Sequence, residues 1–119
     1  SRNTLSADEF LTHLEIPLNF HGNISYQKLR IREAVDFPSV GVAVGLFEDS
    51  VRVCVTGVDT HTHFRIYRRS DFCSLELLTE EAIAVASKSI TILKQDFFPS
   101  SYRKKMIGVY IKRGIGQSK

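Results

Sequence analysis

The sequence lacks the features that mark several functional classes. It has only two cysteines, Cys54 and Cys73, and no CxxC motif, so we expect two reduced thiols in a cytoplasmic protein. No apolar run approaches the roughly 20 residues of a membrane-spanning helix, and no signal peptide is visible. The absence of GxSxG, P-loop and GxGxxG motifs excludes the nucleophile and phosphate-binding elements that these motifs mark.

The composition is that of a globular chain. Of 119 residues, 43% are hydrophobic and 24% are charged, which favours one folded domain spanning residues 1–119. The net charge is only +3, with an isoelectric point near 9.0. A charge this small does not favour nucleic-acid binding without a concentrated basic patch.

The clearest structural signal lies in residues 40–58. Valine and leucine alternate with glycine, alanine and phenylalanine up to residue 47, and valines alternate again from residue 51. The polar break Glu48-Asp49-Ser50 separates the two runs, so the pattern predicts a β-hairpin with one buried β-branched face. The opposite face is small at Gly41, Ala43 and Gly45, where another layer can approach closely.

Strands are expected before the hairpin and helices after it. Alternation predicts strands over residues 10–16 and 24–32, whereas residues 64–72 are ambiguous, with Phe64, Tyr67 and Arg68 able to share a helical face. Thr79 is a good N-cap for a helix over about 80–95, and Ser100 or Ser101 for one over about 101–113 that ends before Gly114. We therefore expect an α+β fold, with an antiparallel sheet of three to four strands over about 10–58 and helices covering one face.

Two sets of side chains could carry chemistry. His61 and His63 could point the same way on an extended segment, but two imidazoles are too few for zinc, and the nearest further ligands are Asp59 and Cys54. No metal site and no catalytic residue is therefore predicted.

Charged residues form the second set. Arginines at 65, 68 and 69, and Arg103-Lys104-Lys105, form two basic clusters near aromatic residues, for which a solvated helical face is the simpler interpretation. Lys28, Arg32 and Asp36 are spaced by four, which fits an anion site or, more simply, an internal ion-pair network.

Residues 26–44 resemble a motif of a known family, Y-x-K…R…D-x-x-x-V-x-V-A. The matching residues are Tyr26, Lys28, Arg32, Asp36 and Val40-Gly41-Val42-Ala43. This motif belongs to the FAD-binding flavoprotein subunits of molybdenum hydroxylases, the oxidoreductase family of carbon monoxide dehydrogenase, xanthine dehydrogenase and 4-hydroxybenzoyl-CoA reductase. The resemblance is to the C-terminal domain of that subunit.

Further matches follow in the family's order along nearly the whole chain. Residues 5–17 resemble its opening segment, with Asp8 where the family has glycine. Thr56-Gly57-Val58 resembles its G-G-V-A-x-x-P-x-R turn, with His63 in place of proline. Tyr102-Arg103 begins a segment that resembles its closing helix.

The resemblance implies an accessory α+β domain of a flavoprotein. The family's main FAD-binding elements lie upstream of this domain, so the isolated chain is expected to hold no cofactor, while FAD belongs to the parent subunit. The partners implied are the upstream FAD-binding domain, the molybdenum-binding subunit and the iron–sulfur subunit. Lys28 and Arg32 are the residues expected to face the flavin, with Asp36 orienting the arginine. The alternative is a stand-alone interaction module with a basic face.

Overall fold

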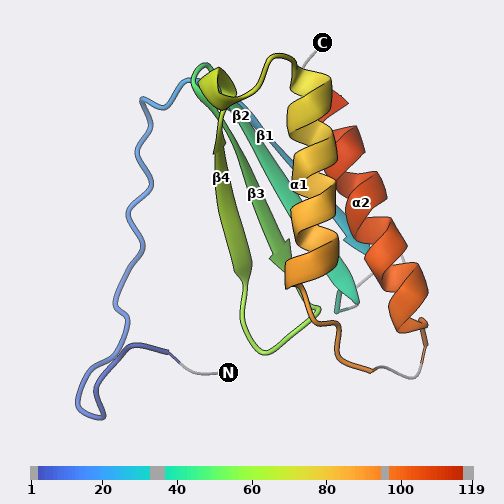
Figure 1. Ribbon diagram of the computed structural model, residues 1–119. Coiled ribbons are helices and arrows are strands. Elements are labelled where there is room, and N and C mark those ends of the chain that lie inside the picture. The colour runs from blue at the N-terminus through green and yellow to red at the C-terminus, as the bar shows by residue number, and fades with distance from the viewer. Residues whose placement is uncertain (1–2, 33–36, 95–96, 117–119) are drawn as a thin grey trace.

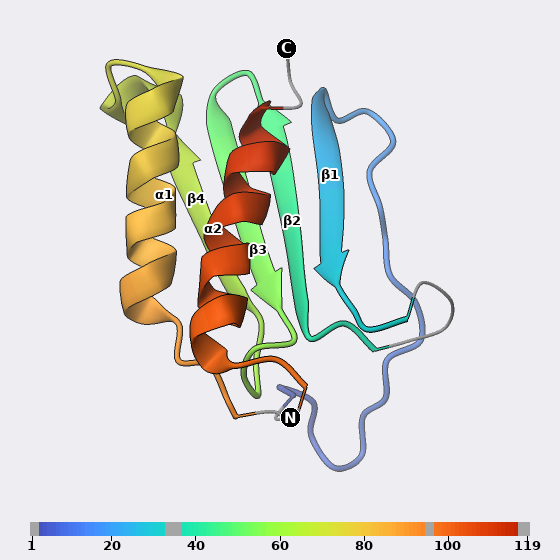
Figure 2. The ribbon, with the colours of Figure 1, turned by 90° about the vertical axis from the view of Figure 1, so that its right-hand side faces the viewer.

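The structure is a computed structural model that describes residues 3–32, 37–94 and 97–116. Two helices cover one face of a four-stranded antiparallel sheet of order β1-β2-β3-β4 (Figures 1 and 2). The elements are β1 (Gly22–Leu29), β2 (Val40–Phe47), β3 (Ser50–Thr56), β4 (His63–Arg68), a 3-10 turn η1 (Arg69–Asp71), α1 (Leu75–Ser89) and α2 (Ser100–Gly116). The expected α+β class and the one-sided helical layer are confirmed.

The predicted hairpin is the centre of the sheet. β2 and β3 pair in the register that sets Val44 opposite Val53 and Val42 opposite Val55. The alternating valines of both strands are buried beneath the helices, together with Leu46. The core therefore lies between the β2–β3 hairpin and the helices, as the period-two pattern requires.

The predicted limits of the sheet are wrong at both ends. Residues 10–16 form no strand, because their alternating side chains find no strand to pair with among the described residues and remain exposed. β1 begins at Gly22 and ends at Leu29, short of Arg32. β4 is a strand where a helical face was considered. Its apolar side chains are shared between the two faces of the sheet, so no period-two hydrophobic pattern develops.

The first helix begins earlier than predicted. Ser74 is its N-cap, and the side chain accepts a hydrogen bond from the Leu77 backbone N–H at 3.3 Å. Thr79 lies inside the helix, where its hydroxyl donates to the Leu75 carbonyl at 2.7 Å. The helix ends at Ser89 rather than near residue 95, and the Leu93 N–H donates to the Val58 carbonyl in the segment that follows.

The second helix buries a residue that the sequence places in solvent. The buried residues of α2 are Arg103, Ile107, Tyr110, Ile111, Gly114 and Ile115, whereas Tyr102 is exposed. Arg103 was placed on the solvent side, yet its exposed fraction is 0%. An arginine in a basic run is normally solvated, so charge patterning alone assigns it to the wrong face.

The Arg103 guanidinium joins three segments of the chain through backbone carbonyls. It donates to the Ser39 carbonyl from Nε and Nη2 at 3.1 and 2.7 Å, to Gly57 at 2.8 Å and to Leu93 at 2.5 Å. Burial lowers the pKa of Arg103, but an arginine stays protonated at neutral pH. The buried charge is therefore satisfied by three carbonyl groups that would otherwise lack these donors.

Gly114 lies within α2 and does not end the helix as predicted. A Cβ at this position would lie 2.5 Å from Cγ2 and 2.7 Å from Cβ of Val44. Glycine is thus required for α2 to approach β2 closely, which is a packing role and not a capping role.

Replacing Arg103 by alanine should lower the free energy of unfolding by about 3 kcal/mol, because it leaves buried carbonyls without donors. Arg103→Lys should recover only part of this loss, since one ammonium group cannot repeat the planar fork. Urea unfolding measures both. Lys104→Ala on the exposed side is the control and should change stability by less than about 0.5 kcal/mol. A similar small loss for Arg103→Ala would contradict the role of the guanidinium.

Gly114→Ala should destabilise the protein by about 1–3 kcal/mol, as overpacking of a filled core does. Gly116→Ala is the matched control, because a Cβ there meets nothing within 4 Å. Alanine is the better helix former, so the control should be neutral or slightly stabilising. Thermal and urea unfolding measure the stability of both variants. An equal change in stability for the two would refute the close-packing argument.

Candidate functional site

The sheet has one face that the helices do not cover, which we call the open face. Cross-strand pairing places Tyr26 opposite Ala43, Ala43 opposite Cys54 and Cys54 opposite Phe64 on this side. On the open face, β2 presents only small side chains at its centre. Tyr26 leans over Gly41, where a Cβ would lie 2.6 Å from the tyrosine oxygen, and Phe47 leans over Gly45.

Large apolar side chains stand exposed on the open face. The exposed fractions are 61% for Ile24, 54% for Tyr26, 54% for Phe64 and 55% for Ile66. Arg52 lies over the Phe47 ring at 4.4 Å from its centroid and forms part of the same surface. Contiguous exposed apolar groups on a sheet are typical of a surface that another protein layer covers.

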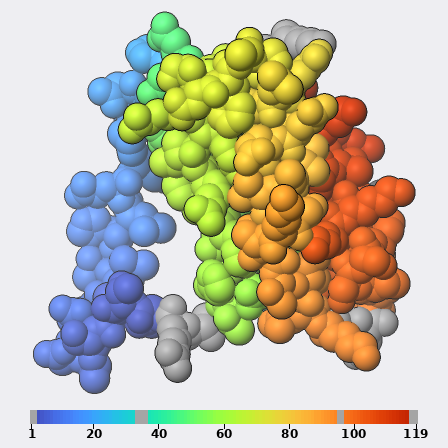
Figure 3. All heavy atoms as spheres, viewed as in Figure 1, coloured from blue at the N-terminus to red at the C-terminus, as the bar shows by residue number. Residues whose placement is uncertain are grey.

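The residues before β1 form an extended arm, residues 3–21, that stands clear of the sheet (Figures 1 and 3). Its apolar side chains are exposed, and Leu18 reaches 96%. Phe20 makes the transition to the folded part, with its ring centroid 6.3 Å from that of Phe47. The arm and the open face therefore both present apolar surface.

The predicted flavin-facing residues lie at one end of the open face. Lys28 is exposed near the end of β1, opposite Gly41. Arg32 is exposed beyond the end of β1, so the spacing of four no longer implies a shared strand face. Asp36 lies outside the described residues. The structure thus puts Lys28 on the rim of the apolar surface and leaves the proposed Asp36–Arg32 pairing untested.

The two basic clusters of the sequence are dispersed by the fold. Arg65 and Arg68 alternate on β4 and so point to opposite faces of the sheet. Arg103 is buried, which leaves Lys104 and Lys105 as the exposed part of the second cluster. Sequence proximity therefore overstated the concentration of positive charge that a nucleic acid would meet.

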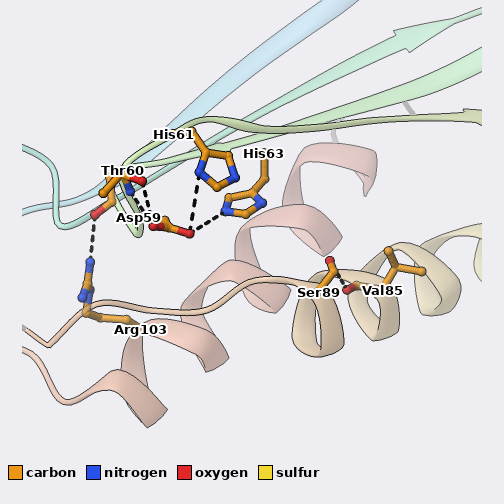
Figure 4. A network of polar contacts seen from close by, with 8 residues as sticks. Asp59, Thr60, His61, His63, Val85, Ser89 and Arg103 are labelled. Atoms are coloured by element: carbon orange, nitrogen blue, oxygen red, sulfur yellow. Dashed lines mark hydrogen bonds and ion pairs between the residues drawn. The ribbon is translucent and has the colours of Figure 1, made fainter. Parts of the chain in front are cut away.

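A separate group of polar side chains gathers in the loop from β3 to β4. Oδ2 of Asp59 lies 3.9 Å from Nδ1 of His61 and 3.5 Å from Nε2 of His63 (Figure 4). The rings of the two histidines are 4.5 Å apart between centroids. The ligand atoms of all three residues lie within 4.8 Å of one another, so the fold brings Asp59, one of the further ligands named from the sequence, beside the two histidines.

Asp59 is held in this arrangement by its neighbour. The Thr60 backbone N–H donates to Oδ1 of Asp59 at 2.6 Å, and the Thr60 hydroxyl donates to the same oxygen at 3.3 Å. The backbone bond first, and then the charge of a nearby His61, lowers the pKa of Asp59. One carboxylate oxygen is therefore occupied and the other is directed at the imidazoles.

His63 also belongs to the wall of a cavity of about 260 Å³ between β4 and α1. Other residues in the wall include Val53, Tyr67 and Ser89. Nε2 of His63 is buried and contacts Oδ2 of Asp59 at 3.5 Å, without the geometry of a regular hydrogen bond among the described residues.

The fold and these surfaces define a small α+β domain with one uncovered sheet face. No model of a known protein family matches the sequence. Neither helix in residues 3–32, 37–94 and 97–116 is long and apolar enough to cross a membrane.

The two cysteines occupy different environments, which predicts different reactivity. Cys54 lies half-buried within β3, and burial raises the pKa of its thiol, whereas Cys73 is exposed before α1. Because the thiolate is the nucleophile, Cys54 should react with a disulfide reagent at neutral pH roughly tenfold more slowly than Cys73, or slower still. Cys73→Ser and Cys54→Ser isolate the two rates. Equal rates would contradict the expectation that the burial of Cys54 slows its reaction.

Proposed function

We propose that this chain is an accessory domain of the FAD-binding subunit of a molybdenum-containing, xanthine dehydrogenase-type oxidoreductase, acting in the cytoplasm. It packs its open face against the upstream FAD-binding domain and so helps to close the flavin site. The observation that carries the proposal is the open face itself, with Ile24, Phe64 and Ile66 more than half exposed. A sheet with a bare apolar face is suited to docking, because covering it removes that surface from water.

The convergence of the resembling segments supports the same assignment. Arg103, from the Tyr102-Arg103 pair, donates to Gly57, from the Thr56-Gly57-Val58 turn, and to Ser39, which precedes Val40. The segments that resemble the flavoprotein family are thus joined at one buried point. They support a common fold, so the proposed role of the domain is structural, with electron transfer carried out by FAD and the partner subunits.

Lys28 is the residue through which the domain would influence the flavin. It lies on the rim of the open face, where a docked domain would bring a cofactor near it. A cation near the edge of an isoalloxazine stabilises the reduced, anionic flavin and raises its potential. Arg32 is proposed to assist from the segment after β1.

The test compares FAD binding by this chain with binding by the gene product that includes the coding sequence upstream of Ser1. Flavin fluorescence and calorimetry should detect binding only by the longer product. Phe64→Asp in that product should weaken FAD binding by roughly tenfold or more, because a charge in a covered apolar interface is left desolvated. Leu77→Asp, on an exposed part of α1, is the control and should leave binding unchanged.

The Lys28→Met variant of the longer product tests the tuning role. Its flavin potential should fall while its FAD content stays close to that of the unsubstituted protein. Unchanged potential would remove the assignment of Lys28. Failure of both lengths of chain to bind FAD would reject the flavoprotein assignment and favour a stand-alone interaction module, which the same open face also supports.

A further inference from the structure

We propose that Asp59, His61 and His63 form a binding site for a divalent transition-metal ion, best matched to Zn²⁺. The site is in the loop that leads into β4, where the side chains of Asp59, His61 and His63 point toward one another (Figure 4). It does not depend on the function proposed above.

The separations between the potential ligand atoms fit a metal ion. Nitrogen and oxygen ligands lie about 2.0–2.2 Å from Zn²⁺ in tetrahedral sites, which sets neighbouring ligands roughly 3.3 Å apart. The Asp59–His63 and Asp59–His61 distances are 3.5 and 3.9 Å. All three ligand atoms lie within 4.8 Å of one another, so binding of one ion requires side-chain rotations that bring the two imidazole nitrogens closer together.

The ligand set selects the class of ion. Two imidazoles and one carboxylate suit Zn²⁺ and its neighbours, whereas Ca²⁺ and Mg²⁺ require oxygen ligands. With three protein ligands, the fourth position is left for water or a small ligand. His63 is also part of the wall of the cavity of about 260 Å³, so space for such a group adjoins the site.

Two further observations distinguish this group from a chance cluster of loop residues. Thr60 donates twice to Oδ1 of Asp59, which fixes the carboxylate and leaves Oδ2 directed at the rings. Outer hydrogen bonds of this kind orient ligating carboxylates in metal sites. In addition, Nε2 of His63 is buried and contacts Oδ2 of Asp59 at 3.5 Å without the geometry of a regular hydrogen bond among the described residues, so a metal ion bound by both atoms would satisfy them.

The experiment is a calorimetric titration of the whole chain with Zn²⁺ after treatment with a chelator. We expect one Zn²⁺ per chain. His61→Ala and Asp59→Asn should each weaken binding at least about tenfold, and the double variant should abolish it. His61 is exposed, so its removal spares the fold; urea unfolding of the metal-free variants checks this.

The chain supplies matched controls for the same measurement. His21→Ala removes an imidazole from the segment before β1, and Cys73→Ser removes the exposed thiol. Neither should change the affinity for Zn²⁺. Equal weakening by His21→Ala and His61→Ala, or binding that survives the His61–Asp59 double variant, would overturn the site.

Co²⁺ provides a spectroscopic test of the ligands. Substitution with Co²⁺ should give visible d–d absorption without a sulfur charge-transfer band, and His61→Ala should remove it. A charge-transfer band that disappears with Cys73→Ser or Cys54→Ser would assign the metal to a thiol and reject the proposal. An absence of Zn²⁺ binding up to millimolar concentration would also reject it.

Discussion

The arrangement of the chain depends on a buried polar interaction, in which the Arg103 guanidinium contacts carbonyls from three separate segments. A guanidinium with no exposed surface costs several kcal/mol to desolvate, and only well-placed partners offset that cost. The partners are carbonyls before β2, after β3 and after α1. Because one rigid fork joins them, the start of α2 is fixed against both strands of the central hairpin. Gly57, with φ of 77°, supplies one of these carbonyls from a backbone conformation that other residues rarely adopt.

The two faces of the sheet follow from the side chains of β2. Valines on one side pack beneath the helices, and Gly114 lets α2 approach Val44 closely. Gly41 and Gly45 on the other side carry no bulk of their own, and the rings of Tyr26 and Phe47 lean over them. These rings cover backbone without closing the surface, because Tyr26 stays 54% exposed. The helices therefore bury one face of the sheet, whereas the open face keeps exposed apolar side chains.

The sequence predicts correctly the elements whose hydrophobic pattern is visible within one continuous segment, such as the central hairpin. The hairpin alternates strictly on both strands, so its existence and the direction of its buried face follow from period two. β4 is missed because Phe64 and Ile66 face outwards while Tyr67 faces the core, which cancels the hydrophobic alternation. The arm alternates as a strand does, yet a strand needs a neighbour and the described chain provides none. Thr79 has a side chain suited to an N-cap, but the helix begins earlier, where the Ser74 side chain accepts a hydrogen bond from the Leu77 N–H.

The candidate metal site, too, could be predicted only in part from the local sequence, because its geometry depends on contacts with distant segments. Asp59, His61 and His63 alternate along the sequence, so their common direction could be inferred, but the distances that make Asp59 a third ligand depend on the loop. That loop is anchored on both sides: Arg103 holds the Gly57 carbonyl, and His63 begins β4. Arg103, which its charged neighbours assign to solvent, therefore anchors the chain two residues before Asp59. The position of this polar cluster thus depends on a contact with the distant helix α2, which the local sequence of the loop does not reveal.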